Sequence, residues 1–241
     1  IQTLEQNMAS NSDRYAFIGL GAMGLPMAIN LQKYLSSNSF APLVVYNRTF
    51  SKTHAVKEIG AIAATSLKQV IEYANIIFTS LANDNAVNQT FNELLSESDL
   101  IDNNKKKIIF VETSTIEPTT VGTLREKVEN TTNRILLYCP VLGPPEVAKN
   151  AMLSIIPSGN QDAINYMLPL LTTVLGKKVL PAGDDVKNAA KFKLIGNLFV
   201  FGAGELLSEG LTLAEKSGVD KEMLLNFISS PEFITNVYRR Y

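Results

Sequence analysis

The sequence predicts an α/β fold with a doubly wound parallel sheet, followed by an all-α domain that opens with one long interdomain helix. Two observations predict the sheet. Between about residues 14 and 181 short apolar runs alternate with amphipathic stretches, and the runs are apolar throughout, as in strands covered on both faces. Beyond residue 181 only helical patterning remains. We therefore expect a disordered leader or expression remnant at 1–13, the α/β domain at 14–181, and an incomplete helical domain at 182–241.

Short apolar runs predict the strands, which in chain order are Tyr15–Leu20, Leu43–Tyr46, Ile76–Ser80, Lys107–Glu112, Ile135–Cys139 and Leu153–Pro157. Apolar residues at helical spacing, several of them after Ser, Thr or Asn caps, predict the helices Gly24–Tyr34, Ser51–Glu58, Ser66–Tyr73, Asn85–Leu95, Thr119–Glu129 and Gln161–Leu175. Predicted helices thus separate the first five strands from one another, which is the pattern of βαβ units.

The helical domain is predicted from an uninterrupted apolar pattern. No proline lies between Asn188 and Ser217, so this stretch predicts one helix of roughly 45 Å. Apolar residues around Leu194–Leu207 fall on nearly every side, and we expect the helix to be buried all round. Glycines within it suggest close approach of another backbone or a ligand: Gly196, Gly202, Gly204 and Gly210. With only one further helix, at Lys221–Ser229, the core is incomplete, so we expect residues after Tyr241 or a partner subunit to complete it.

Composition argues against several classes of partner. The 22 basic and 23 acidic residues give a formal net charge of −1, so we expect no nucleic-acid partner and no anionic membrane partner. A single cysteine, Cys139, and a single histidine, His54, exclude an intrachain disulfide and a His-Cys metal cluster, and we predict no metal. The sequence shows neither a signal-peptide pattern nor a run of about eighteen apolar residues, so the expectation is a soluble, cytoplasmic protein.

A glycine motif follows the first predicted strand and opens the first predicted helix. It reads Gly19-Leu20-Gly21-Ala22-Met23-Gly24. In this context Gly19 permits a tight turn, Gly21 lets the backbone approach a pyrophosphate, and Gly24 allows close packing of helix on strand. The strand-turn-helix context favours a dinucleotide site over a turn kept for packing alone.

The end of the second strand indicates which dinucleotide binds. Folds that prefer NAD usually place an acid there for the ribose 2′-hydroxyl, whereas this chain has Asn47-Arg48-Thr49. Arg48 can pair with a 2′-phosphate, and Thr49 adds a donor, so NADP(H) is favoured over NAD. The alternative is that Arg48 is a solvated residue at a strand end.

These motifs and their order resemble the β-hydroxyacid dehydrogenase family, which includes 3-hydroxyisobutyrate dehydrogenase, plant glyoxylate and succinic semialdehyde reductases and, more distantly, 6-phosphogluconate dehydrogenase. The resemblance runs from Tyr15 to about Ser229 and implies a Rossmann-type nucleotide domain. Glu112-Thr113-Ser114-Thr115 resembles the family's Asp-x-Ser-Thr segment, which implies that Thr115 lies by the nicotinamide. Ser80-Leu81-Ala82 stands where family members pass a strand end along the cofactor.

The resemblance also implies the catalytic residues. The segment from Ala190 to Asn197 is similar to the family's Lys-x-x-x-Asn at the start of the interdomain helix. Lys193 and Asn197 are four residues apart and project from one helix face. Lys193 would be the general acid or base, because an ammonium can give a proton to a developing alkoxide, and Asn197 would orient the substrate oxygen. Lys191 is the competing lysine, but the residue four positions after it is Ile195 and not an asparagine.

One segment departs from the family pattern. The family's Asp-Ala-Pro-Val-Ser-Gly-Gly holds a substrate carboxylate, and here Cys139–Pro145 reads Cys-Pro-Val-Leu-Gly-Pro-Pro. Leu142 replaces the serine hydroxyl, and Pro144 has no backbone N–H. We expect Leu142 and Gly143 at the substrate and a more apolar carbonyl or imine compound than a small 3-hydroxy acid. The alternative is that Leu142 only packs the domain interface.

The sequence thus predicts an NADP(H)-dependent oxidoreductase. Hydride would pass reversibly between the nicotinamide and a small carbonyl or hydroxy-acid-like substrate in the cleft between domains, without a metal. The long apolar helix predicts a homodimer or higher homo-oligomer through the helical domain. Two alternatives stay open: a non-catalytic NADP-binding scaffold or interaction protein, like the family's chromatin-associated member, which lacks the lysine, and an imine reductase, which often has another proton donor at the lysine position.

Overall fold

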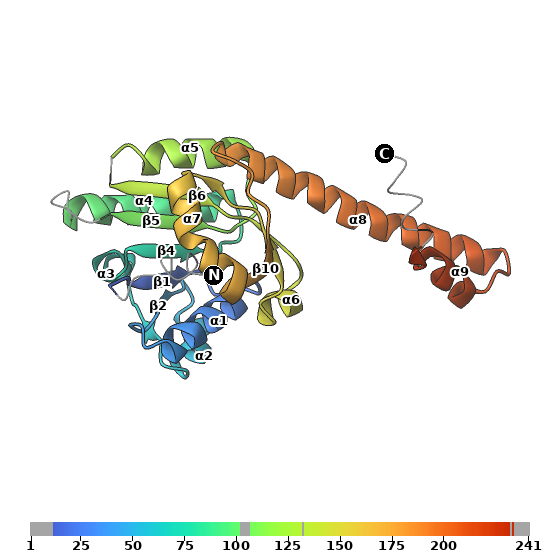
Figure 1. The fold of residues 1–241 in the computed structure, drawn as a ribbon, viewed down its shortest axis with the longest axis horizontal. Coiled ribbons are helices and arrows are strands. Elements are labelled where there is room, and N and C mark those ends of the chain that lie inside the picture. Colours follow the sequence, from blue (N-terminus) through green and yellow to red (C-terminus); the bar gives the residue numbers. More distant parts are fainter. Residues whose placement is uncertain (1–11, 102–106, 132, 232, 234–241) are drawn as a thin grey trace, which may run out of the picture. The chain divides into compact units, whose positions relative to one another are not determined.

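The computed structural model describes residues 12–101, 107–131, 133–231 and 233 (Figure 1). By its internal contacts the chain divides into a first unit, Ile1–Leu194, and a second unit, Ile195–Tyr241. The division falls inside a long helix, α8, which runs from Val186 to Lys216. The leader expected at 1–13 lies mostly outside the described residues, but its last residue, Asp13, is buried and accepts hydrogen bonds from Asn75 and Tyr166.

A seven-stranded sheet forms the centre of the first unit, in the order β3-β2-β1-β4-β5-β6-β9. All neighbours are parallel except β6 and β9. The strands are β1 (Tyr15–Ile18), β2 (Val44–Tyr46), β3 (Ile62–Ala63), β4 (Ile76–Thr79), β5 (Ile108–Glu112), β6 (Arg134–Tyr138) and β9 (Ser158–Gly159). The order reverses direction at β1 and β4, which is the doubly wound topology that the sequence predicts.

Helices cover both faces of this sheet (Figure 1). They are α1 (Gly24–Ser37), the 3-10 turn Phe50–Thr53 with α2 (His54–Lys57), α3 (Leu67–Tyr73), α4 (Asp84–Ile101), α5 (Pro118–Val128), α6 (Pro145–Lys149), and α7 (Gln161–Leu170) with its π-helical extension Leu171–Leu175. Strand alternation divides the core: Phe17 of β1 packs with α1 and α7, whereas its neighbour Ile18 packs with α3, α4 and α5. Both faces are therefore buried.

One predicted strand belongs elsewhere. Leu153–Pro157 was expected in the main sheet, but β8 (Leu153–Ile155) lies in a separate three-stranded sheet between β10 (Gly176–Val179) and β7 (Val141–Leu142). The sequence misses this sheet because β7 has only two residues and β10 reads Gly-Lys-Lys-Val, without an apolar run. Pairing of β7 with β8 fixes the segment that precedes α6.

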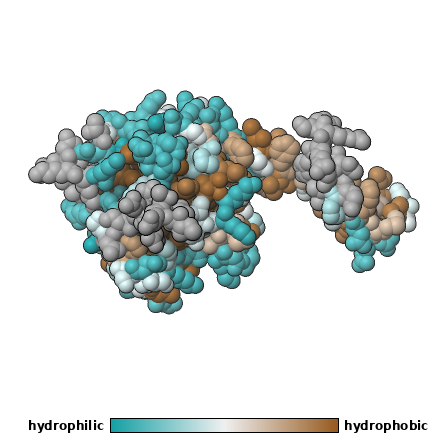
Figure 2. All heavy atoms as spheres, in the orientation of Figure 1, coloured by the Kyte–Doolittle hydropathy of each residue, from teal (hydrophilic) through white to brown (hydrophobic). Residues whose placement is uncertain are grey.

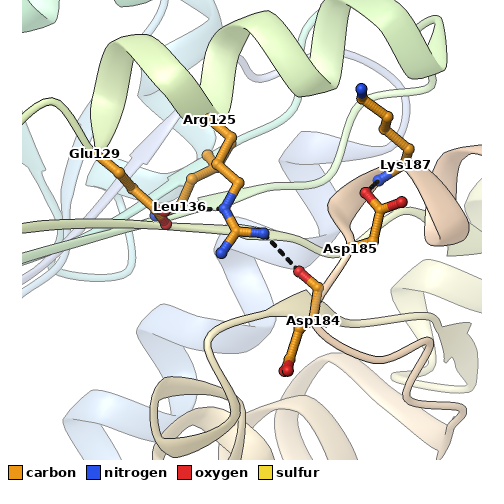
Figure 3. A network of polar contacts seen from close by, with 6 residues as sticks. All are labelled: Arg125, Glu129, Leu136, Asp184, Asp185 and Lys187. Carbon is orange, nitrogen blue, oxygen red and sulfur yellow. Dashed lines mark hydrogen bonds and ion pairs between the residues drawn. The ribbon is translucent and has the colours of Figure 1, made fainter.

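A polar network ties the start of α8 to the first unit (Figure 3). Arg125 of α5 donates from Nη1 to the carbonyl oxygen of Asp184 at 2.6 Å and from Nε to Glu129 at 2.9 Å. Glu129 in turn accepts the backbone N–H of Leu136 in β6 at 3.1 Å. Asp185 accepts the backbone N–H of Lys187 and so caps the first turn of α8. The first residues of α8 are thereby fixed against α5 and β6.

In the second unit the structure describes the rest of α8 and α9 (Lys221–Ile228), and most of their large apolar side chains are exposed. Phe201 is 72% exposed, and Leu198, Phe199, Val200 and Leu206 are exposed as well. Hydrophobic residues are visible on the surface of this part of the chain in Figure 2. The described chain by itself does not bury this helix, and its completion by further residues or by a partner subunit stays a prediction. A Cβ added at Gly202, Gly204 or Gly210 would meet nothing within 4 Å. The described residues therefore do not supply the close contact that these glycines predict.

By length and composition alone, α8 is the one described helix that could cross a membrane. The core helix of a soluble protein passes the same test. Its first three turns are not uniformly apolar, because they include Lys187, Lys191 and Lys193.

Candidate active site

The described part of the first unit contains a cleft of about 610 Å³ at the carboxyl ends of β1, β2, β4 and β5. This is the edge of a doubly wound sheet at which nucleotides bind, next to the reversal of strand order. It is lined by the glycine turn, the loops after β2, β4 and β5, part of the segment after β6, Leu67 of α3, one face of α4 and Lys193 of α8. Every lining residue belongs to the first unit.

Each glycine of the turn has its own steric reason. Gly19 has a φ of +93°, and a Cβ there would lie 2.2 Å from the carbonyl oxygen of Ser80. A Cβ at Gly24 would lie 1.9 Å from the carbonyl oxygen of Gly19, where α1 crosses β1. Gly21 is exposed to the cleft, and a Cβ there would meet nothing within 4 Å. The turn is thus closed where it packs and open where a pyrophosphate would approach, so a dinucleotide fits it.

Asn47 joins the glycine turn to the loop after β2. Its Oδ1 accepts the backbone N–H of Leu20 at 2.8 Å, and its Nδ2 donates to the carbonyl oxygen of Thr49 at 2.9 Å. Gly19 also donates its N–H to the carbonyl oxygen of Tyr46 at 2.9 Å. Leu20 itself is buried beneath the turn and does not line the cleft.

The loop after β2 presents cations to the cleft. Arg48, Thr49 and Lys52 are exposed and line it. The strand end carries no carboxylate, although Glu93 of α4 lies in the wall of the same cleft. These groups could hold a 2′-phosphate through charge-assisted hydrogen bonds.

Loops after β4 and β5 form the opposite end of the cleft and are bonded to each other. Leu81 donates its backbone N–H to Ser114 Oγ at 2.7 Å, and Thr113 Oγ1 donates to the carbonyl oxygen of Thr79 at 2.7 Å. Ser80, Ala82 and Thr115, which the sequence places along the cofactor, line the cleft with them.

Lys193 of α8 also lines the cleft. It is 9% exposed, whereas Lys191, two residues earlier, is exposed. Burial lowers the pKa of the Lys193 ammonium below its usual value, because a charged group is less stable away from water. Asn197 stands four residues later on α8, half-buried, and belongs to the second unit. The cleft of the first unit does not include it.

The segment after β6 reaches the cleft only in part. Val141 and Gly143 line it, but Leu142 packs against the apolar cluster of α3, α4 and α5. Gly143 has a φ of +138°, and a Cβ there would meet Leu153 and Val147 at 2.9 Å. Pro144 caps α6, and Pro145 is its first residue. Neither proline has an N–H to donate.

The structure therefore brings most of the predicted site residues together. Those that line the cleft are Gly19, Gly21, Ala22, Met23, Gly24, Asn47, Arg48, Thr49, Ser80, Leu81, Ala82, Thr115, Gly143 and Lys193. Leu20, Leu142 and Asn197 do not.

Sequence reasoning misses one face of α4. Ala86, Gln89, Thr90 and Glu93 line the cleft, and their spacing of three, four and seven residues is that of one helix side. This spacing was the only available signal, because the residue types are those of an ordinary solvated helix.

Comparison with known proteins places the chain among oxidoreductases. Residues 14–183 match a family model described as the NAD binding domain of 6-phosphogluconate dehydrogenase. The uncharacterized oxidoreductase YfjR of Bacillus subtilis is 32% identical over 95% of this chain and 76% of its own length. The NADH-dependent oxidoreductase ucdB of Aspergillus ustus is 29% identical over 82% of this chain and 64% of its own length. Glyoxylate/succinic semialdehyde reductase 1 of Arabidopsis thaliana is 30% identical over 88% of this chain and 70% of its own length.

Solved structures share the fold. The 3-hydroxyisobutyrate dehydrogenase of Mycobacterium tuberculosis gives a TM-score of 0.77 at 21% identity and covers 90% of this chain and 70% of that one. An imine reductase from a Pseudomonas species gives 0.79 at 22% identity, covering 94% and 75%. These likenesses confirm the predicted fold class.

Proposed function

The chain belongs to the family defined by the NAD binding domain of 6-phosphogluconate dehydrogenase, and we propose that within it the chain is an NADP(H)-dependent reductase of small carbonyl compounds. Membership and the oxidoreductase relatives confirm the resemblance drawn from the motifs. The nucleotide specificity, the chemistry of Lys193 and the substrate class belong to the proposal. The observation that carries it is a buried lysine in the same cleft as a complete dinucleotide turn.

Preference for NADP(H) is supported by the loop after β2. Arg48 and Lys52 supply positive charge beside Thr49, and the strand ends without a carboxylate that would repel a 2′-phosphate. A charge-assisted hydrogen bond of this kind contributes about 1.5–3 kcal/mol, which corresponds to a preference of about ten- to a hundredfold. Because one relative is named as NADH-dependent, the proposed preference rests on these side chains and not on the family.

Lys193 is the proton donor in this proposal. When bound, the reduced nicotinamide would supply a hydride to the carbonyl carbon, and the electron pair of the C=O π bond would move to oxygen. Lys193 gives that oxygen a proton and is left neutral, then regains a proton from solvent. Burial lowers the pKa of Lys193, which makes its ammonium a stronger acid near neutral pH. In the oxidative direction the neutral amine takes the hydroxyl proton.

Asn197 orients the substrate oxygen in this account. It follows Lys193 by four residues on the continuous helix α8, so both side chains leave the helix on one side.

The segment after β6 supports a substrate without a carboxylate at that point. Leu142 has no hydroxyl and packs in the core, and Pro144 has no N–H, so two hydrogen bonds that could hold a carboxylate are missing. We infer an aldehyde, ketone or imine with an apolar substituent. An imine would be protonated by Lys193 at nitrogen rather than at oxygen, so the two substrate classes need the same residue.

A second copy of the chain would cover the apolar side chains of α8 in this proposal. Leaving Leu198, Phe201 and Leu206 in water is unfavourable by about 25 cal/mol per Å² of apolar surface. The open space at Gly202, Gly204 and Gly210 leaves room for a close helix from that copy. We therefore propose a homodimer or higher homo-oligomer through α8.

The second candidate is a non-catalytic NADP-binding module. The lack of hydrogen-bond donors in the segment after β6 favours this non-catalytic module. Lys193 favours an enzyme instead, because a lysine is costly to bury and is more often kept buried in a cleft for catalysis.

Turnover of wild-type protein separates these functions. Oxidation of NADPH and of NADH is followed with short aldehydes, keto acids and cyclic imines. We expect oxidation of NADPH, faster than of NADH, with aldehydes, ketones or imines rather than with keto acids. Tight binding of NADPH without turnover on any compound would contradict the reductase and support the module. Turnover of keto acids alone would contradict the inferred substrate class.

A further inference from the structure

A carboxyl group lies fully buried beneath the loops of the cleft. Glu112 is the last residue of β5 and is 0% exposed, with β4 on one side of its strand and β6 on the other. It does not line the cleft itself. Thr113, Ser114 and Thr115, which follow it directly, do.

The two carboxylate oxygens of Glu112 accept hydrogen bonds from two different loops. Thr79 Oγ1, at the end of β4, donates to Oε2 at 2.5 Å. The backbone N–H of Ser114, after β5, donates to Oε1 at 2.5 Å. The carboxylate therefore bridges the ends of two neighbouring strands.

Further hydrogen bonds of Ser114 connect Glu112 with residues that line the cleft. Ser114 Oγ accepts the N–H of Leu81, and the carbonyl oxygen of Ser114 accepts the hydroxyl of Tyr138 at 2.9 Å. Leu81 and Ser114 both line the cleft. A change at the Glu112 carboxylate would thus move Leu81 and Ser114 together.

Stability alone gives no reason for a carboxyl group at this place. None of the ion pairs among the described residues reaches Glu112. The titratable groups that face it are Tyr138 and Cys139, and both have raised pKa values because of burial, so both are neutral. Burial also raises the pKa of Glu112 to about 7, against the opposing effect of its hydrogen bonds. An apolar side chain would avoid this cost, since an unpaired buried charge is unfavourable.

We propose that Glu112 is a positioning residue for the reactive half of the cofactor: its carboxyl group clamps the loops after β4 and β5, and so sets where Leu81, Ser114 and Thr115 meet the nicotinamide. The inference rests on the proposed NADP(H) function. In a doubly wound sheet the dinucleotide spans the reversal of strand order, with one nucleoside on each side. The adenosine half is assigned to β2 by Arg48, which leaves the nicotinamide half to β4 and β5.

Three variants separate the clamp from its surroundings. Thr79→Val keeps the shape of the side chain and removes the hydrogen bond that Thr79 Oγ1 donates to Glu112. Glu112→Leu removes both acceptors. Glu112→Gln can still accept the N–H of Ser114 and donate to Thr79 Oγ1, so it restores both bonds without the charge. The matched control is Thr53→Val, because Thr53 is also 0% exposed, its Oγ1 donates to the carbonyl oxygen of Phe50 at 2.7 Å, and it lies outside the cleft lining.

The readout is the emission of NADPH bound to the full chain, which reports on the dihydronicotinamide, together with the Kd of NADPH and, once a substrate is found, kcat. In Thr79→Val and Glu112→Leu we expect an altered emission and a kcat lower by about tenfold or more, because small misplacements of reacting groups are costly. The Kd should stay within about threefold, since the phosphate contacts lie elsewhere. Glu112→Gln and Thr53→Val should give emission close to that of wild type.

Two results would overturn the inference in distinguishable ways. If wild-type protein does not bind NADPH, the proposed function fails and the inference fails with it. If wild type binds NADPH and the emission of Thr79→Val matches that of Thr53→Val, the positioning role of Glu112 is wrong while the proposed function stands. Should Glu112→Leu not fold, Thr79→Val still decides the matter.

Discussion

The Oδ1 atom of Asn47 accepts the backbone N–H of Leu20 at 2.8 Å, so the loop after β2 and the glycine turn are held as one piece. The same side chain donates from Nδ2 to the carbonyl oxygen of Thr49 at 2.9 Å. An aspartate could make the first bond but not the second. Asparagine therefore positions the loop that carries Arg48 and also leaves this strand end without negative charge.

Asn47→Asp should shift the preference from NADPH towards NADH. The new carboxylate would repel a 2′-phosphate and lose the bond to Thr49, so we expect the Kd of NADPH to rise by about tenfold or more. The Kd of NADH should change by less than about threefold, because its ribose hydroxyl can donate to the carboxylate. Titration of both nucleotides checks this. An equal loss of affinity for NADPH and for NADH would contradict a role of Asn47 in nucleotide selectivity.

Gly24→Ala should lower the stability of the fold, whereas Gly21→Ala should lower the affinity for NADPH. A Cβ at Gly24 would lie 1.9 Å from the carbonyl oxygen of Gly19, so backbone must shift, and we expect a loss of about 2–4 kcal/mol in unfolding free energy. A Cβ at Gly21 meets nothing within 4 Å, so stability should be kept while NADPH affinity falls. Denaturant unfolding and NADPH titration of both variants test the pair. Equal stability of the two would contradict the packing role of Gly24.

This contrast shows what the sequence could predict. The glycine turn is readable because its context, strand before and helix after, leaves few conformations for Gly19 and Gly24. The separate sheet of β7, β8 and β10 could not be predicted, since β7 has only two residues and β10 has no apolar run. Leu142 illustrates the same limit: its residue type suits a substrate wall or a core, and only the pairing of β7 with β8 directs it to the core.

Some residues of the candidate site could likewise be predicted from the sequence, and others could not. Lys193 could be predicted only through the resemblance to the family's Lys-x-x-x-Asn, whose spacing Lys193 has and Lys191 lacks. In the structure Lys193 is the buried one of the two lysines. Glu112 lay inside a quoted motif, but its role is visible only once β4 and β5 are neighbours. The α4 face escaped prediction because Gln89 and Glu93 are common on any solvated helix.

Glu112→Gln should stabilise the fold at alkaline pH. Burial raises the pKa of this carboxyl from 4.5 to about 7. The folded chain therefore holds a proton that the unfolded chain releases, and the resulting stability is present below pH 4.5 and lost as pH rises through about 7. Relative to wild type, the Tm of Glu112→Gln should rise by a few degrees at about pH 8 and little at about pH 5. A Tm difference that does not depend on pH would contradict the raised pKa.

Phe201→Glu should weaken self-association. Phe201 is 72% exposed on α8, and a charge there would be costly in an apolar helix contact. We expect sedimentation to show a dimer or larger oligomer for wild type and a smaller species for the variant. The control is Met152→Glu, an exposed apolar residue of the first unit at 47%. A monomeric wild type would contradict the oligomer, and so would an unchanged oligomer in Phe201→Glu.

The most direct test of the central claim compares Lys193→Ala with Lys191→Ala in NADPH-dependent turnover. The two lysines are neighbours on α8, one buried in the cleft and one exposed. We predict that Lys193→Ala lowers kcat by about a hundredfold or more while the Kd of NADPH stays within about threefold, and that Lys191→Ala resembles wild type. In wild type, reduction should slow as pH rises through the lowered pKa of Lys193. Equal turnover in the two variants would contradict Lys193 as the proton donor.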